Sequence, residues 1–342
     1  MTNKRVGLDS FWMPYSSNRN FKARPRMLVS AAGMFYRDER GREILDATSG
    51  MWCCNAGHCR ASIAAAVTDQ IKTLDFAPTY QMGHPKAFEL AERLAGDVFP
   101  AGLDRIVFAN SGSEAIDSAI KIVLTYQNLR GKAGKSLLIA RDRAYHGGNL
   151  GGSSICGIAN NRRRLGNLLA ADFLPHTHDL SRNRYSRGQP KRGGLEFANA
   201  LQRLIDLHGA ERIAAVFIEP VPGSTGVLVP PTGYLPRIRE ICTANDILLV
   251  FDEVITGFGR VGAKTASQRF RVTPDLLAFA KSVTSGTMPL GGVAVRRDIA
   301  QTFLDAAEPN TIDFFHGYTF AGHPLAAAAA LAAQELYAAE GL

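Results

Sequence analysis

The most constraining stretch of the chain is residues 247–260, where an apolar run stops at two carboxylates and a glycine-rich turn. The run 247–251 is short and aliphatic or aromatic throughout, which is typical of a strand buried on both faces of a parallel sheet. Asp252 and Glu253 follow it directly. Because ligands bind beyond the carboxyl ends of the strands in such sheets, Asp252 is well placed to contact a ligand. The alternative is an acid that caps a loop or pairs with a nearby arginine.

After two successive helical segments, segments typical of strands and helices alternate along the chain from about residue 105 onward. The expected strands cover residues 105–110, 136–140, 213–218 and 247–251, and the expected helices cover 61–74, 87–98, 114–129, 195–207, 233–245 and 325–337. This alternation predicts an α/β fold with a mostly parallel central sheet and helices on both faces. We expect a large domain over residues 60–315. Residues 1–59 would form an N-terminal arm and part of a small domain, with hairpin strands at 34–37 and 44–46, and residues 316–342 would begin a C-terminal segment.

The composition and charge of the chain exclude some classes of function and leave one alternative open. The 342 residues are 46% hydrophobic, which is enough for a sizeable core, and no apolar run is long enough to span a bilayer. Nothing at the N-terminus has the layout of a signal peptide, so a cytoplasmic protein is expected. The net charge is +8, with basic clusters at 162–164 and 182–192. We expect a solvated basic surface there; the alternative is a nucleic-acid patch, for which no recognition motif is present.

The five cysteines of the chain include a cluster near the N-terminal end. Cys53, Cys54 and Cys59 lie close to His58, but their spacing matches no standard zinc pattern. We therefore expect reduced thiols and no metal site; a metal site is the alternative. Trp52 adjoins the cluster in an irregular segment flanked by glycine, where the wall of an active site and a packed core position are both open.

A second candidate site is the turn 110–114, which joins an expected strand to an expected helix. Ser111 or Ser113 can cap the helix, and Gly112 lets the backbone approach a ligand closely. The free N–H groups and the positive dipole end of a helix N-terminus suit a phosphate. The segment has neither the Gly-Lys-Ser/Thr of a P-loop nor the GxGxxG of a dinucleotide site. It is therefore a cradle for the phosphate of some other compound, or a plain helix cap.

Three further candidate residues lie where apolar strands end. Glu219 ends an expected strand, and a second acid near Asp252 would suit a protonated ring. Lys281 directly follows an apolar run; a buried lysine is costly unless it has a partner or a task, and burial makes its amine a nucleophile toward carbonyls. Tyr145 comes shortly after a strand, where an aromatic ring can stack on a flat ligand. Taken singly, each has an ordinary alternative: an exposed acid, a lysine that reaches the surface, or a core tyrosine.

The chain carries a candidate phosphate cradle, a stacking ring, an acid and a buried lysine in this order. In this pattern it resembles the class III (omega) aminotransferases, which are pyridoxal phosphate enzymes of fold type I. The matching segments are SGSEA at 111–115, YHG at 145–147, EP at 219–220, DEVITGFGR at 252–260, AKS at 280–282 and HGYTFAGHP at 316–324. Each segment is weak alone, but together and in order they are specific, and the similarity covers essentially the whole chain. The N-terminal sequence, from FKARPRMLVSAAG to APTYQMGHP, is most similar to the beta-alanine (omega-amino acid)–pyruvate aminotransferase branch of this family.

The resemblance implies pyridoxal 5'-phosphate as the cofactor and a role for each matching residue. Lys281 would form the Schiff base with the cofactor aldehyde and then move a proton between the substrate carbon and the cofactor. Asp252 would pair with the pyridine nitrogen and keep it protonated, which makes the ring a better electron sink. The other implied cofactor contacts are Tyr145 and Val254 on the two ring faces, Ser111, Gly112 and Ser113 at the phosphate, Glu219 at the polar edge, and His146 beside Tyr145.

The resemblance also implies a homodimer, or a dimer of dimers, with active sites shared between subunits. Thr319 would reach the phosphate of the neighbouring subunit's cofactor, and Trp52 and Tyr80 would line the substrate pocket, Tyr80 from either subunit. The implied reaction moves an amino group from an omega-amino acid or amine, similar to beta-alanine, to pyruvate with ping-pong kinetics. The alternatives are another class III aminotransferase, with 4-aminobutyrate or another amine as donor and a different keto acid as acceptor, or an inactive truncated homologue.

One departure from the family pattern concerns the C-terminal end. In this family a further C-terminal segment completes the small domain and supplies the arginine that binds the substrate carboxylate, whereas this sequence ends at Leu342. The resemblance therefore assigns that arginine's role to no residue here, and we expect residues 1–342 alone to be poorly active.

Overall fold

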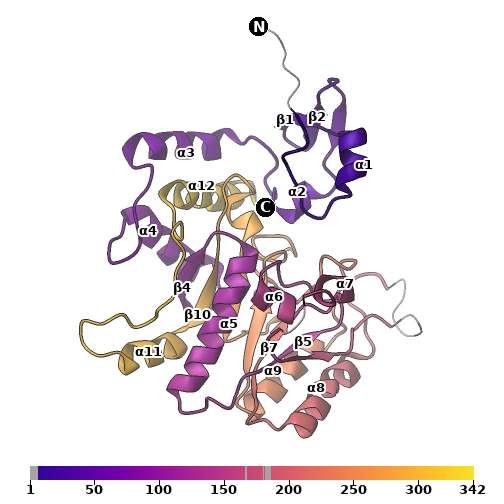
Figure 1. Cartoon of the computed structure of the whole chain (residues 1–342), viewed down its shortest axis with the longest axis vertical. Coiled ribbons are helices and arrows are strands. Elements are labelled where there is room, and N and C mark those ends of the chain that lie inside the picture. Colours follow the sequence, from indigo (N-terminus) through magenta and orange to yellow (C-terminus); the bar gives the residue numbers. More distant parts are fainter. Residues whose placement is uncertain (1–6, 166–167, 180, 182–185) are drawn as a thin grey trace.

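The computed structural model of the chain describes residues 7–165, 168–179, 181 and 186–342. Figure 1 shows two parts: a large sheet with helices on both faces, and a small N-terminal lobe that holds a second sheet. Of the basic stretch expected at the surface over 182–192, residues 182–185 lie outside the described part of the chain.

The small sheet is antiparallel, with the order β1-β2-β3. Its strands are β1 (Leu28–Ala32), β2 (Phe35–Asp38) and β3 (Glu43–Leu45). The expected hairpin is confirmed as β2 and β3, whose register pairs Arg37 with Glu43. Gly41 takes the positive φ of 77° that the turn needs, and the Asp38 carboxylate accepts a hydrogen bond from the N–H of Arg42 at 2.9 Å. Strand β1, which the sequence did not predict, adds the end of the N-terminal arm to this hairpin.

The large sheet has the order β4-β10-β9-β8-β7-β5-β6 and is mostly parallel, as the sequence predicts. Its strands are β4 (Leu103–Ala109), β5 (Leu137–Arg141), β6 (Ala171–Leu174), β7 (Ile213–Ile218), β8 (Leu248–Asp252), β9 (Leu276–Phe279) and β10 (Gly291–Arg296). Neighbours from β6 to β9 pair in parallel, whereas β10 is antiparallel to both β9 and β4. The carboxyl ends of β5, β7, β8 and β9 therefore meet at one edge, where ligands bind in sheets of this kind.

All the expected helices are present. They are α3 (Ala61–Thr73), α4 (Pro85–Arg93), α5 (Gly112–Leu129), α8 (Gly194–His208), α9 (Tyr234–Ala244) and α12 (Pro324–Glu340), and α4 continues as a π-helical turn over Leu94–Val98. The described residues also form α1 (Asn18–Ala23), α2 (Ser49–Trp52), α6 (Leu150–Ser154), α7 (Ala159–Arg162), α10 (Ala266–Phe270) and α11 (Arg297–Ala306). These additional helices, except α11, are of one or two turns, too short to leave a periodic pattern in the sequence.

The helices divide between the two faces of the large sheet (Figure 1). Helices α5 and α11 cover one face, where Phe217 and Val250 are buried. On the other face, α8 and α9 cover β5, β7 and β8, and the alanine-rich α12 covers the region of β9 and β10. Every residue of β7 and β8 is buried. Successive strand residues point to opposite faces, so burial on both faces accounts for the continuous apolar runs in the sequence.

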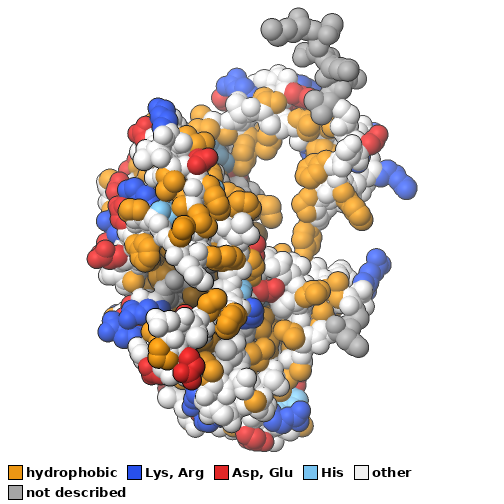
Figure 2. All heavy atoms as spheres, turned by 60° about the vertical axis from the view of Figure 1, so that its left-hand side comes forward, with side chains coloured by type: hydrophobic (Ala, Val, Ile, Leu, Met, Phe, Trp, Pro, Cys, Tyr) orange, Lys and Arg blue, Asp and Glu red, His pale blue; other side chains and the backbone are white. Residues whose placement is uncertain are grey.

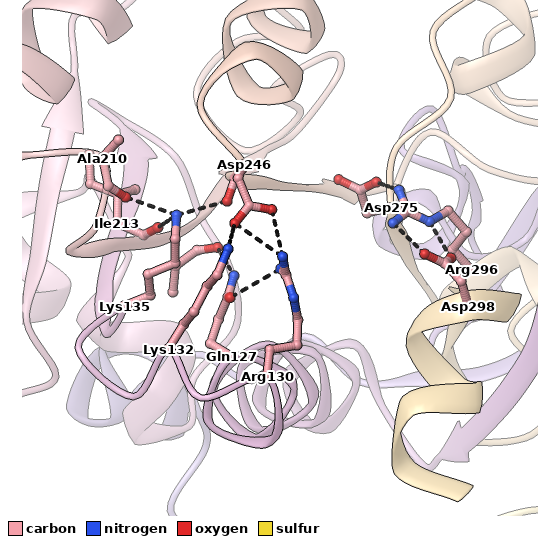
Figure 3. Close-up of polar contacts among 11 residues, drawn as sticks. Gln127, Arg130, Lys132, Lys135, Ala210, Ile213, Asp246, Asp275, Arg296 and Asp298 are labelled. Atoms are coloured by element: carbon pink, nitrogen blue, oxygen red, sulfur yellow. Dashed lines mark hydrogen bonds and ion pairs between the residues drawn. The ribbon is translucent and has the colours of Figure 1, made fainter. Parts of the chain in front are cut away.

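A cluster of polar contacts joins the segments at the amino-terminal edge of the large sheet (Figure 3). The buried ammonium of Lys135 donates hydrogen bonds to the carbonyl oxygens of Ala210 (2.8 Å), Ile213 (3.3 Å) and Asp246 (2.8 Å). The Asp246 carboxylate pairs with Arg130 at 3.0 Å and with Lys132 at 2.6 Å. These contacts join the segments that lead into β5, β7 and β8, so the sheet is held together at the edge opposite the ligand-binding edge.

Large apolar side chains are exposed on one side of the molecule. Figure 2 brings forward the side where α4 and the loop before α12 lie, and hydrophobic side chains gather there. The exposed residues of α4, of the segment before it and of the loop before α12 include Tyr80, Met82, Phe88, Phe315 and Phe320, which we call the apolar face. Exposed apolar clusters of this kind commonly mark interaction surfaces. Within the described residues, no helix combines the length and apolar character needed to cross a membrane.

Candidate active site

A cavity of about 450 Å³ opens at the carboxyl ends of β7, β8 and β9. Most of the residues that the sequence analysis singled out line it: Ser111, Gly112, Ser113, Tyr145, His146, Glu219, Asp252, Val254 and Lys281. They come from five separate segments of the chain, so the fold brings the separate motifs together in one place. Met51, Ile255 and Met288 also line the cavity, and the sequence analysis did not identify them. Cys53 lines it too, although the sequence analysis assigned it only to the thiol cluster.

Two buried carboxylates stand side by side at the bottom of the cavity. Asp252 is the last residue of β8, and Glu219 follows the last residue of the neighbouring β7. The Asp252 carboxylate contacts Nδ1 of His146 at 2.8 Å through one oxygen and accepts the N–H of Val254 at 3.1 Å through the other. Burial raises the pKa of Glu219, and the Asp252 charge raises it further, while His146 and Arg141 oppose the shift. A protonated ring nitrogen would offset the charge of this pair.

Lys281 follows the end of β9 after one residue, Ala280, and begins the 3-10 turn Lys281–Thr284. Burial lowers the pKa of its amine, and the Asp252 carboxylate partly offsets the effect. Its φ of 51° lies in the left-handed region, where a residue with a side chain is strained by about 1–2 kcal/mol. Two hydrogen bonds of the turn hold it in place, from Ser282 Oγ to the carbonyl of Trp52 (3.0 Å) and from Thr284 Oγ1 to the carbonyl of Met288 (2.7 Å). A lysine amine with a lowered pKa is a nucleophile toward carbonyl carbon.

The N-terminus of α5 faces the same cavity. Ser111 caps the helix by accepting the N–H of Glu114 at 3.2 Å, and the Glu114 carboxylate accepts the N–H of Asn110, the residue before the cap, at 2.7 Å. The N–H groups of Gly112 and Ser113, in the first turn, have no carbonyl partner within the helix. A Cβ on Gly112 would lie 2.7 Å from Val254 Cγ1, so only glycine fits this close contact. The arrangement suits an anionic group such as a phosphate.

Tyr145 enters the cavity from the segment after β5. Its N–H donates a hydrogen bond to Glu219 Oε1 at 3.0 Å, which ties the aromatic residue to the acid. Its ring meets the ring of Tyr15 edge-on, with the centroids 6.4 Å apart. Burial, together with the interaction of its hydroxyl with that of Tyr15, raises the pKa of the Tyr145 hydroxyl. Tyr15 belongs to the N-terminal arm, and the sequence analysis assigned it no place in the site. Its position depends on the folding of the arm over the cavity, and the only local signal is an aromatic among polar residues.

Three expected residues lie outside the cavity of their own chain. Trp52 is half-buried beside it, and its carbonyl rather than its ring holds the lysine turn. Tyr80 and Thr319 are exposed, and the Tyr80 ring lies close to Gly317 in the loop before α12. The structure therefore brings together the expected cofactor residues except Thr319, and leaves the expected substrate residues apart from them. Across the described residues, no three His, Cys, Asp or Glu side chains gather as a metal ion would require.

Comparisons with known proteins identify close similarity over nearly the whole chain. The family described as "Aminotransferase class-III" matches residues 16–342. An omega-aminotransferase of Caulobacter vibrioides is 54% identical over 98% of this chain and 76% of its own length. An omega-amino acid–pyruvate aminotransferase of Pseudomonas putida is 50% identical over 99% and 75%. Among solved structures, the pyridoxal-phosphate-bound amine transaminase of an uncultivated Pseudomonas species has a TM-score of 0.87 at 35% identity, covering 97% of this chain and 75% of that one.

Proposed function

The chain belongs to the class III aminotransferases, and we propose that it transfers an amino group from an omega-amino acid or a related amine to pyruvate. The donor and acceptor are those in the name of the Pseudomonas putida relative. The observation that carries the proposal is the single cavity in which Lys281, Asp252 and the N-terminus of α5 meet. An amine nucleophile, an acid and a phosphate cradle around one flat space are the groups that pyridoxal phosphate requires.

The residues present fit this cofactor. Class III aminotransferases use pyridoxal 5'-phosphate, which supplies an electron sink when bound. The main-chain N–H groups of Gly112 and Ser113 would hold the phosphate, and the Gly112 cradle is one that a Cβ would fill. Asp252 would hold the proton of the pyridine nitrogen, with His146 fixing the carboxylate from behind through the 2.8 Å contact. The remaining proposed contacts are Tyr145 and Val254 on the two faces of the ring and Glu219 at its polar edge.

Lys281 would carry the proton transfers. Its Nζ would bind the cofactor covalently, leave when the amine substrate arrives, and then take the proton from the substrate carbon that bears the amino group. The lowered pKa of this amine favours the neutral form that can accept a proton. In the second half of the cycle the same Nζ would return a proton to the acceptor carbon. Tyr15, Tyr145 and Met51, near the mouth of the site, would exclude water.

We propose a homodimer in which the apolar face lies between subunits. Tyr80, Phe88, Phe315 and Phe320 expose large apolar surfaces there, and burying such surface favours association. Thr319 lies in the same region, is exposed, and is not among the residues that line the cavity of its own chain. This position supports a role for Thr319 at the phosphate of the neighbouring subunit's cofactor, and for Tyr80 in the neighbour's substrate pocket. Trp52 would line the substrate pocket of its own subunit.

We also propose that the large cofactor-binding domain spans residues 60–315. The large sheet, from β4 to β10, falls within these limits. Residues 1–59 would belong to the N-terminal arm and the small domain, and residues 316–342 would begin the C-terminal segment.

The experiment that tests the function separates cofactor binding from turnover. The purified chain is titrated with pyridoxal phosphate, and we expect a visible absorption band that Lys281→Ala abolishes and that Lys86→Ala, at an exposed lysine of α4, retains. Donors such as beta-alanine and 4-aminobutyrate are then supplied with pyruvate or 2-oxoglutarate, and alanine or glutamate is measured. A protein that takes up no cofactor, or a band that survives Lys281→Ala, would contradict the proposal. Turnover with 2-oxoglutarate alone would replace the pyruvate assignment.

A further inference from the structure

Arg141 is the largest side chain that is fully buried, and the mechanism gives it no task. It is the last residue of β5, directly behind the cofactor cavity. One guanidinium nitrogen, Nη2, donates a hydrogen bond to the main-chain oxygen of Glu219 at 2.7 Å. Nε and Nη1 have no hydrogen-bond partner among the described residues. A charge buried in this way is costly and calls for an explanation.

Two neighbours of Arg141 bring no negative charge. The guanidinium carbon lies 5.7 Å from the centre of the Tyr234 ring. Burial raises the pKa of the Tyr234 hydroxyl, and Arg141 only partly offsets this shift. His176 is also close enough to feel its charge: burial and then Arg141 lower the pKa of His176 to about 4, so the imidazole is neutral. Nδ1 of His176 accepts the N–H of His178 at 3.0 Å, which leaves the proton on Nε2. Tyr234 and His176 therefore supply no charge opposite to that of Arg141.

The carboxylate on which the Arg141 charge acts is Glu219. Burial and the neighbouring Asp252 raise the pKa of Glu219, and Arg141 is one of the charges that oppose this shift. The Glu219 carboxylate accepts the N–H of Tyr145 at 3.0 Å and that of Gly223 at 3.4 Å. Two links thus cross between the ends of β5 and β7. Arg141 holds the main chain of Glu219, and the side chain of Glu219 holds the main chain of Tyr145.

We propose that Arg141 is a positioning residue of the cofactor site, which holds Glu219 from behind and keeps its carboxylate charged and directed into the cavity. This inference rests on the proposed function, because Glu219 and Tyr145 are the residues proposed to contact the cofactor. The alternative is that Arg141 only fills space and links two strands. A positioning role and a space-filling role predict different cofactor binding in variants that keep the positive charge at position 141 and in variants that lose it.

The test compares Arg141→Gln with Arg141→Lys, which keeps the charge, and with Arg143→Gln as the control. Arg143 lies two residues further on and is exposed. The affinity for pyridoxal phosphate is measured by absorbance titration, and the asymmetry of the site by the visible circular dichroism of the bound cofactor. We expect Arg141→Gln to weaken binding about tenfold or more and to reduce the dichroism, as the loss of a charged hydrogen bond predicts. Arg141→Lys should recover most of the affinity, and Arg143→Gln should stay within about twofold of the parent.

A double-mutant cycle shows whether Arg141 acts through Glu219. In a Glu219→Gln background, Arg141→Gln should weaken cofactor binding by no more than about twofold. The proposal is overturned if Arg141→Gln binds like the parent, if Arg141→Lys is as damaging as Arg141→Gln, or if the loss is undiminished in the Glu219→Gln background. It is also overturned if both Arg141 variants fail to fold while Arg143→Gln folds, since the arginine would then serve the fold. If the parent chain takes up no cofactor, the proposed function fails and this inference with it.

Discussion

Gly147 is the position where one methyl group should do the most damage to the cofactor site. Its φ is +99°, and a Cβ built there would lie 2.7 Å from Cα and 2.6 Å from Oγ of Ser113. Ser113 stands in the first turn of α5, and its Oγ accepts the N–H of Gly148 at 3.0 Å. The Cα of a helix cannot rotate aside as a side chain can. In Gly147→Ala, the segment that carries Tyr145 must therefore move away from the phosphate end of the site.

The magnitude follows from two costs. A side chain at positive φ costs about 1–2 kcal/mol, and overpacking a tight contact costs about 1–3 kcal/mol, which together make roughly 2–5 kcal/mol. The segment can relax in the apoprotein and must return to its place to bind the cofactor. We therefore expect the free energy of cofactor binding to become less favourable by about 3 kcal/mol. Since each 1.4 kcal/mol is about tenfold, the dissociation constant for pyridoxal phosphate should rise about 100-fold.

The assay is an absorbance titration of the apoprotein with pyridoxal phosphate, and the adjacent glycine provides the control. A Cβ on Gly148 would meet nothing within 4 Å, and its φ is not positive. Gly148→Ala should therefore bind within about twofold of the parent. If Gly147→Ala binds as tightly as the parent, or if Gly148→Ala loses as much affinity, the contact between Gly147 and Ser113 does not shape the phosphate site.

Three further substitutions test contacts outside the cofactor cavity. Glu253 is fully buried and accepts the N–H groups that begin α10. Glu253→Gln should therefore lower the free energy of unfolding by about 3 kcal/mol in urea titrations. A change under about 1 kcal/mol would show that the loop repacks. Asp246→Asn removes the carboxylate partner of Arg130 and Lys132 (Figure 3) and should cost only about 0.5–1 kcal/mol, because the carboxylate is partly exposed; a loss that persists undiminished in 1 M salt would contradict an ionic origin. Because the pKa of His176 is about 4 when folded and about 6.5 when unfolded, only the unfolded chain takes up this proton as the pH falls between those values. Stability should fall across that window, and His176→Gln should flatten the fall in unfolding curves recorded at pH 7 and at pH 4.5; an unchanged slope would remove His176 as the cause.

The periodic elements of the fold could be predicted from the sequence, and pairings between distant strands could not. Helices α5 and α9 and strand β7 fall close to their expected limits because each carries its own apolar pattern. Strand β10 was missed, although Gly291–Arg296 is apolar, because it follows β9 closely and turns back to pair antiparallel on both sides. Partner choice of this kind depends on tertiary packing and leaves no local signal.

The cofactor side of the site could be predicted because its residues occupy strand ends and a helix start, where sequence patterns are informative. Asp252, Lys281 and the Ser111 cap are of this kind. The walls of the cavity could not. Met51 lines it in place of the neighbouring Trp52, and Tyr15 reaches Tyr145 from the N-terminal arm. Both contacts depend on irregular backbone at positive φ in the N-terminal lobe, and irregular segments of this kind carry no periodicity from which a side-chain direction can be read.

The position of β10 explains how the phosphate cradle and the lysine come to share one cavity. Parallel register pairs Asp252 with Ala278, so the end of β8 lies beside the end of β9 and Lys281 follows within one turn. The cradle, in contrast, follows β4, which lies beyond β10. A Cβ on Gly291 would meet the main-chain oxygen of Ser111 at 2.6 Å, so a residue without a side chain is needed for the cradle to close against β10. Strand β10, antiparallel to both of its neighbours in the large sheet, thus sets the separation between the anion-binding end and the nucleophilic end of the site. A larger residue at Gly291 should weaken cofactor binding while Lys281 and Asp252 keep their places.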